Sequence, residues 1–295
     1  MVICIIYMVL LRRRSSRVLL TAFDITTFIR KIQVNTTSPH RIPRIIHQTW
    51  KTKQVPKHWK ETVRTVRTLN APHFEYRLWT DEDIHAFVRQ EEPYLYNHTF
   101  LKYPLDIQRI DAFRYIVLHR LGGIYIDMDN GCIQPFDTLL NVLEMVDAQS
   151  AHLAAFPRTS PVGISNGFMI ATKGHPLFKT LVSHLSLFNH NYLVDYLTVM
   201  LTTGPLYLSV NEFYFDKSIE PSAVRILDET VYSSLYTWHT PGNSWHGRDA
   251  RAILFIYHSF RKYSPFRFYQ CLLFLIVLVA IILYRRRYRR RRQLF

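Results

Sequence analysis

The chain has 295 residues, 48% of them hydrophobic, which is enough for one large folded domain or two small ones. Its three cysteines are too few for a disulfide framework. The formal net charge of +15 resembles that of a nucleic-acid binder, but eleven arginines near the two ends supply most of it and leave +4 over the rest. No nucleic-acid-binding module is recognisable, so we expect no nucleic-acid partner.

Residues 1–29 form an apolar and basic N-terminal segment. Its first eleven residues, MVICIIYMVLL, are apolar but too few for a typical membrane span. The arginines follow this stretch, whereas in a signal peptide they come first. The pattern fits either a signal or an anchor and does not decide between them.

Residues 41–262 are predicted to form a single globular domain, because they contain neither repeats nor long linkers. RIIHQTW and FEYRLW are typical of short strands, and PKHWKETVRTVRTLN is typical of a helix between Pro56 and Pro72. Thr80-Asp-Glu-Asp predicts a second helix that opens with a capping box. Strands that alternate with helices predict an α/β fold with a largely parallel sheet.

A third helix is predicted over LDIQRIDAFRYIVLHRL, where apolar residues recur at three- and four-residue steps. Gly122 and Gly123 end this helix, and IYID then reads as a short buried strand. The three-residue step from Asp111 to Arg114 places both side chains on one face of the helix.

Asp127 and Asp129 follow the buried strand. If the extended backbone continues, both carboxylates point to one side and Met128 points to the core. Two adjacent carboxylates repel each other, and a divalent cation such as Mn²⁺ or Mg²⁺ removes that repulsion. In open α/β sheets ligands bind beyond the carboxyl ends of the strands, where such a cation can hold the diphosphate of a nucleotide-sugar.

The C-terminal end is predicted to cross a membrane. FYQCLLFLIVLVAIILY lacks charged residues, and seven arginines follow it. We therefore predict a transmembrane helix at 266–284 and a basic cytosolic tail at 285–295, which makes the preceding domain lumenal. Asn35 and Asn97 lie in glycosylation acceptor patterns that agree with this topology.

Several motifs carry a family resemblance. IPRIIHQTWK, YRLWTDED and RIDAFRYIVLHRLGGIYIDMD resemble glycosyltransferase family 32, the glycosyltransferases with an Asp-x-Asp sugar-binding motif. SPVGISNGFM, GHPLF, YLTVMLTTGPLYLSV and GNSWHGRDA resemble its fungal mannosyl inositol phosphorylceramide synthase branch. The resemblance covers roughly Arg41 to Ile256. It implies a GT-A-like (Rossmann-like) fold, a divalent cation, and transfer of mannose from GDP-mannose with retention of configuration.

The resemblance also implies roles for individual residues. Asp127 and Asp129 hold the metal and the diphosphate-sugar, and Asp111 and Arg114 match positions that contact the donor. The remaining expected roles are metal binding by His246, or by Asp249 as a second candidate, and substrate contacts from His47, Trp50, Asn166, Ser244 and Trp245. The turn at 202–205 is expected to shape the pocket wall. No catalytic base or nucleophile signature is recognisable.

One position departs from the branch pattern, which usually has an acidic residue where Gly167 stands. The loss of this carboxylate leaves the identity of the acceptor, or activity itself, open. Ser165 and Asn166 remain beside it as polar contacts.

The favoured hypothesis is a Golgi mannosyltransferase, anchored in the membrane, that acts on inositol phosphorylceramide in sphingolipid biosynthesis. Two alternatives stay open. One is a hexosyltransferase acting on a protein or glycan, and the other is an inactive homologue with a regulatory or binding role. The expected partners are GDP-mannose, a lipid acceptor and the membrane, and the need for a separate regulatory subunit stays open.

Overall fold

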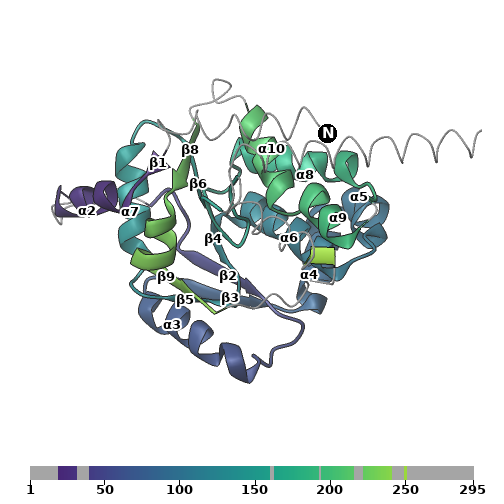
Figure 1. Ribbon diagram of the computed structural model, residues 1–295, viewed down its shortest axis with the longest axis horizontal. Coiled ribbons are helices and arrows are strands. Elements are labelled where there is room, and N and C mark those ends of the chain that lie inside the picture. The colour runs from purple at the N-terminus through teal and green to yellow at the C-terminus, as the bar shows by residue number, and fades with distance from the viewer. Residues whose placement is uncertain are drawn as a thin grey trace, which may run out of the picture.

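A mixed sheet of seven strands lies at the centre of the described part of the chain (Figure 1). The computed structural model describes residues 19–31, 40–159, 163–192, 194–215, 222–240 and 249–250. The strand order is β1-β8-β6-β7-β4-β2-β3. The bounds of these strands are β1 Leu19–Leu20, β2 Ile45–Thr49, β3 Glu75–Trp79, β4 Gly123–Ile126, β6 His152–Pro157, β7 Phe168–Ala171 and β8 Ser222–Leu227.

The sheet is largely parallel, as predicted, with one reversed strand. Strand β7 runs antiparallel to both β4 and β6, whereas the other neighbouring pairs are parallel. In its pairing with β4, Phe168 at the start of β7 lies opposite Ile126 at the end of β4. The reversal therefore brings the segment before β7 to the edge at which β2 and β4 end.

Helices cover both faces of the sheet. One core cluster contains Tyr125 and side chains of α4, α5, α6, α8 and α10, and the other contains Ile124, Ile126 and side chains of α2, α3 and α7. Successive residues of β4 thus point to opposite faces, as in any strand. Figure 1 shows α8, α9 and α10 beside one another, on the side of the sheet away from α3.

The helices and the remaining short elements have the following bounds. They are α2 Ala22–Lys31, η2 Lys57–Trp59, α3 Lys60–Asn70, α4 Asp81–Glu91, α5 Pro93–His98, η3 Phe100–Lys102, α6 Asp106–Leu121, α7 Asp137–Val146, α8 Pro176–Phe188, α9 Asp195–Thr202, α10 Pro205–Tyr214 and η4 Val231–Tyr236. Strands β5 Asn130–Cys132 and β9 Thr237–His239 form a second, antiparallel pair.

The elements predicted in the first half of the domain are confirmed. The predicted capping box is present at the start of α4, where Thr80 and Asp83 exchange hydrogen bonds. A cap of this kind typically contributes about 1 kcal/mol. Gly122 ends α6 with a φ of 69°, a backbone conformation that favours glycine.

Helix α6 is buried over more of its surface than the apolar spacing alone indicates. Its residues from Asp111 to Leu118 are all buried, including the polar Asp111 and Arg114. Burial of two opposite charges is tolerated because they pair with each other, at 3.4 Å. The helix is therefore part of the interior, and its polar pair points to a role in the site.

The described fold starts before residue 41. Residues within the predicted N-terminal segment form β1, which pairs with β8, and α2, which packs against α7. Within the described ranges, no helix is long and apolar enough to cross a membrane. The predicted span at 266–284 and the tail at 285–295 lie outside the described residues.

Candidate active site

The Asp-x-Asp motif lies at the sheet edge where the parallel strands β2 and β4 end. Asp127 directly follows β4, and its backbone N–H donates a 2.8 Å hydrogen bond to the carbonyl oxygen of Gly167. The chain then turns, and the Asn130 N–H donates a 3.1 Å hydrogen bond to the carbonyl oxygen of Asp127. The extended backbone on which the same-side orientation depends does not continue past Asp127. A turn replaces it, and the two carboxylates have different partners.

Met128, between the two aspartates, faces the interior as predicted. It is 5% exposed and packs with Trp59 and Val63 at the start of α3. Its carbonyl oxygen accepts a 2.6 Å hydrogen bond from the Thr62 hydroxyl. These contacts attach the middle of the motif to α3.

One oxygen of the Asp127 carboxylate is fixed by the protein. Oδ1 lies 3.0 Å from Nη2 of Arg114 and accepts a 3.0 Å hydrogen bond from the Tyr125 hydroxyl. The guanidinium of Arg114 also lies over the Tyr125 ring, 4.8 Å from its centroid. Oδ2 has no hydrogen-bond partner among the described residues, and the side chain is 30% exposed. Oδ2 is thus the oxygen available to a ligand.

Asp111 and Arg114 join this carboxylate in one buried network. Burial raises the pKa of Asp111 and of Asp127, and the charge of Arg114 opposes both shifts. Burial also lowers the pKa of Arg114, but the neighbouring carboxylates and tyrosines raise it by more, so the guanidinium stays charged. One buried cation therefore serves two carboxylates.

Asn166 links the network to the segment before β7. Its side-chain amide donates a 3.0 Å hydrogen bond to Oδ1 of Asp111, and its carbonyl oxygen accepts a 3.0 Å hydrogen bond from Arg114. On the other side Thr203 donates a longer bond, of 3.4 Å, to Oδ2 of Asp111. The predicted substrate contact of Asn166 is thus replaced here by a positioning role, and the turn at 202–205 forms part of the wall around Asp111.

Asp129 has a partner that the sequence interpretation missed. Its Oδ2 lies 3.1 Å from Nε2 of His239, and its Oδ1 accepts a 2.9 Å hydrogen bond from the Asn130 side chain. Antiparallel pairing places His239 opposite Asn130, which carries the histidine to the motif. The hydrogen bond with Asp129 raises the pKa of His239. Only the pairing of β5 with β9 reveals this contact, and no local sequence pattern indicates that pairing.

His47 and Trp50 lie near this edge without forming an open binding surface. The ring of His47 is fully buried, its Nε2 donates a 2.9 Å hydrogen bond to the Gly122 carbonyl oxygen, and its Nδ1 accepts a 3.1 Å bond from the Trp79 indole. Burial lowers the pKa of His47 to about 4, so the ring is neutral. This geometry replaces the predicted nucleotide contact of His47 by a structural role. Trp50 is partly buried and packs edge-on against Trp59.

Gly167 lies directly against the motif. A Cβ atom at this position would lie 2.7 Å from Oδ2 of Asp127 and 3.4 Å from Oγ of Ser165. Real Cβ atoms do not approach another atom as closely as 2.7 Å, so any side chain at residue 167 displaces the Asp127 carboxylate. The departure from the branch pattern thus determines where Asp127 can lie.

Three predicted site residues, Ser244, Trp245 and His246, lie outside the described residues. Asp249, the second candidate metal ligand, accepts a 2.8 Å hydrogen bond from the backbone N–H of Tyr196 at the start of α9. This contact occupies one of its oxygens at a helix N-terminus.

The donor set suits a hard divalent cation. The described residues include no group of three or more His, Cys, Asp or Glu side chains arranged to hold a metal. Mg²⁺ and related ions are commonly bound by one or two carboxylates together with substrate phosphates, and the free Oδ2 of Asp127 with Asp129 fits that pattern. The charge of Asp129 raises the pKa of Asp127, a repulsion that a bound cation would relieve.

Comparison with known proteins agrees with this geometry. Residues 56–145 match the family described as "Glycosyltransferase sugar-binding region containing DXD motif". Over 276 residues the chain is 34% identical to "Inositol phosphoceramide mannosyltransferase 1" of Schizosaccharomyces pombe, covering 90% of this chain and 82% of the relative. The chain belongs to the inositol phosphoceramide mannosyltransferase family.

Other family members are longer than this chain. "Mannosyl phosphorylinositol ceramide synthase SUR1" of Saccharomyces cerevisiae is 36% identical, with 78% of this chain and 62% of the relative covered. "Inositol phosphoceramide mannosyltransferase 2" of Schizosaccharomyces pombe is 40% identical, with coverages of 72% and 61%. The chain thus spans less than two thirds of the length of these two relatives. The residues matched by the family description, 56–145, include Asp111, Arg114, Tyr125 and Asp127.

Proposed function

We propose that the protein transfers mannose from GDP-mannose to the head group of inositol phosphorylceramide, using a divalent cation held by Asp127 and Asp129. The network that fixes Asp127 on one oxygen and leaves the other free is the observation that carries this proposal. The names of its relatives supply the acceptor. By the same analogy the fold is of GT-A type, the cation is Mn²⁺ or Mg²⁺, and the transferred sugar retains its configuration.

In this mechanism the chain mainly positions groups. A bound cation supplies positive charge to the departing diphosphate. Arg114 and Tyr125 hold the Asp127 carboxylate in one orientation before substrate arrives, so that little reorganisation is needed in the transition state. Asp111 and Asn166 in turn hold Arg114. We assign no nucleophile.

We also propose that the domain faces the lumen of the secretory pathway. The arginine-rich C-terminal tail and the acceptor patterns at Asn35 and Asn97 support this orientation. If the protein migrates more slowly in electrophoresis and an endoglycosidase that removes N-glycans restores its mobility, the result supports this orientation. Protease digestion of the domain in sealed vesicles would contradict it.

The decisive experiment is mannose transfer from GDP-mannose to inositol phosphorylceramide by membranes that contain this chain. It is run with Mn²⁺, with Mg²⁺, with a chelator, and with the variants Asp127→Ala and Asp129→Ala. We expect metal-dependent product that is lost in both variants. Lys179→Ala, whose side chain is exposed on α8, is the control and should leave the metal dependence unchanged. If the membranes contain folded protein and any regulatory subunit that it needs, and still form no product, the choice of acceptor is overturned.

A further inference from the structure

A strongly basic surface lies beside the site. We call it the basic rim, and it consists of six exposed side chains, Lys51, Lys53, Lys57, Lys60, Arg64 and Arg67. Glu61 is the single carboxylate between residues 51 and 67. This short segment therefore carries a net charge of +5, more than the +4 of the whole chain without its eleven terminal arginines.

The basic rim adjoins the Asp-x-Asp motif on two sides. It begins directly after Trp50, which follows the end of β2 at the same sheet edge as Asp127. Its helical part, α3, contacts Met128 through Thr62, Val63 and the preceding Trp59. The positive charge thus lies at the border of the site.

The charges of the basic rim are only partly neutralised by the protein. Lys53 pairs with Asp83 at 2.9 Å, and Arg64 pairs with Glu61 at 2.6 Å. Arg67 lies over the ring of Tyr76, 5.1 Å from its centroid. For Lys51, Lys57 and Lys60 the described residues supply no acidic partner. Positive charges that gather on one surface without acidic partners repel one another and attract anions. We therefore expect an anionic ligand from outside the chain.

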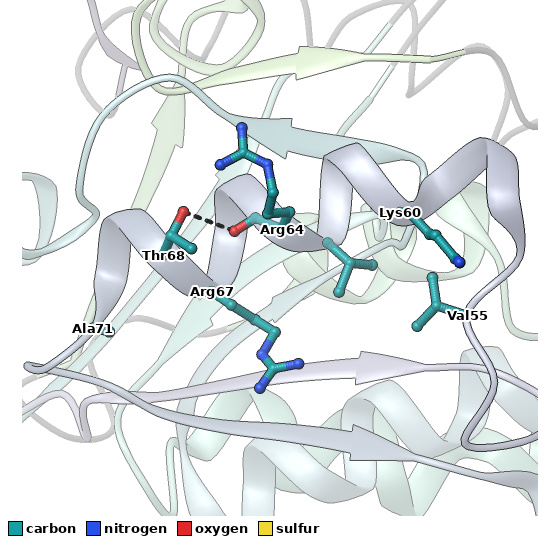
Figure 2. A pocket seen from close by; sticks show the side chains of 7 residues that line it. Val55, Lys60, Arg64, Arg67, Thr68 and Ala71 are labelled. Carbon is teal, nitrogen blue, oxygen red and sulfur yellow. Dashed lines mark hydrogen bonds between the residues drawn. The ribbon is translucent and has the colours of Figure 1, made fainter.

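A groove of about 460 Å³ along α3 adds an apolar component (Figure 2). Val55, Val63 and Ala71 line it together with Lys60, Arg64 and Arg67. Figure 2 shows Arg64 and Arg67 leaving α3 on different sides of the helix. Apolar and cationic groups along one groove match a surface that combines anionic groups with hydrocarbon, as a lipid bilayer does.

We propose that the basic rim docks onto the surface of an anionic bilayer and so holds the sugar-transfer site at the level of the lipid head groups. This inference deepens the proposed function, because a lipid acceptor has to be reached in its membrane. From Lys57 to Arg67 the helical segment extends over about 15 Å, more than one diphosphate can contact. The extent of the charge therefore favours a surface over a single free nucleotide.

The test uses the full chain reconstituted in nanodiscs of phosphatidylcholine alone or with about 30% phosphatidylserine. Hydrogen exchange of the amides at 51–69 is measured in both. We expect exchange in the loop at 51–56 to be about fivefold slower on the anionic discs, and this protection to fall at high salt. Equal exchange on both kinds of disc would overturn the proposal.

Two charge-reversal variants make the test specific. Lys51→Glu, Lys57→Glu and Lys60→Glu combined should abolish the protection. The matched control reverses Lys102, Lys173 and Lys179, exposed lysines of η3, the turn after β7 and α8, and should keep it. Equal protection in the two variants would contradict the proposal. Protection of this loop by GDP on the neutral discs, with none added by the anionic discs, would overturn it in favour of nucleotide binding.

The same discs, prepared with an equal amount of inositol phosphorylceramide in both kinds and supplied with GDP-mannose, separate this inference from the proposed function. Hydrogen exchange requires no turnover, so lipid-dependent protection without mannose transfer would retain the docking surface and reject the acceptor. Transfer at equal rates on neutral and anionic discs, with no difference in exchange, would retain the enzyme and reject the docking surface.

Discussion

The two carboxylates of the Asp-x-Asp motif lie in contrasting surroundings. Asp127 is fixed from inside by Arg114 and Tyr125, in a network that includes the buried Asp111. Asp129 lies nearer the protein surface and is held by His239, whose side chain is 46% exposed. We call Asp127 with its network the interior half of the site, and Asp129 with His239 the outer half. The comparison indicates that the interior half is organised before substrate binds, whereas Asp129 in the outer half can exchange His239 for a cation.

The largest effect is expected from Arg114→Met, which breaks the interior half. The buried Asp111 and the partly buried Asp127 would lose their shared cation, and loss of one partner from a buried pair typically costs about 3–5 kcal/mol. Urea unfolding should show a destabilisation of this size, and mannose transfer should fall by more than about 100-fold. Arg109→Met on the same helix removes a partly exposed ion pair with Asp106 and a hydrogen bond to the Tyr103 carbonyl oxygen, and should cost about 1–2 kcal/mol. Equal unfolding energies for the two variants would refute the role of the network.

A smaller and more selective effect is expected from Gly167→Ala. The new Cβ would lie 2.7 Å from Oδ2 of Asp127 and push this oxygen away from its ligand position. Calorimetric titration with Mn²⁺ and GDP should show an affinity about tenfold lower, in the range typical of changes next to metal ligands. Gly174→Ala is the control, since a Cβ atom there meets open space, although its positive φ of 73° disfavours alanine. It should lower stability and leave metal affinity unchanged.

The smallest effect is expected from His239→Gln, measured without metal. The hydrogen bond with Asp129 raises the pKa of His239, so the protonated ring stabilises the fold at pH values below its unfolded pKa of about 6.5. This contribution is lost as the pH rises through the folded-state pKa. The variant should therefore be less stable than the wild type near pH 5.5, by at most about 1 kcal/mol, and equal to it near pH 8.5. A difference that grows with pH would contradict the assignment.

Local patterns in the sequence, together with the family resemblance, were sufficient for the interior half of the site. The three-residue step placed Asp111 and Arg114 on one face of α6, and the strand after the two glycines placed Asp127 at the sheet edge. The family resemblance put the three in one site, and the structure joins them. The turn after Asp127 was missed, although Asp129, Asn130 and Gly131 are residues typical of turns. What determines it is the hydrogen bond from the Asn130 N–H to the Asp127 carbonyl oxygen.

Contacts between segments far apart in the sequence could not be predicted from sequence patterns. His239 meets Asp129 only because β9 pairs with β5, and strands of three residues are too short to show a period. Strand β1, of two residues, likewise gives no signal of its pairing with β8, more than 200 residues later. The partners of such strands depend on the packing of the whole domain.

The reversed strand β7 has a consequence for which substitutions affect the site. Because β7 runs against β4 and β6, the connection from β6 both leaves and re-enters the sheet at the edge that carries the two aspartates. The end of this connection belongs to the network, since Asn166 contacts Asp111 and Arg114. Gly167 accepts a hydrogen bond from the Asp127 backbone. Substitutions just before β7 therefore act directly on the position of Asp127.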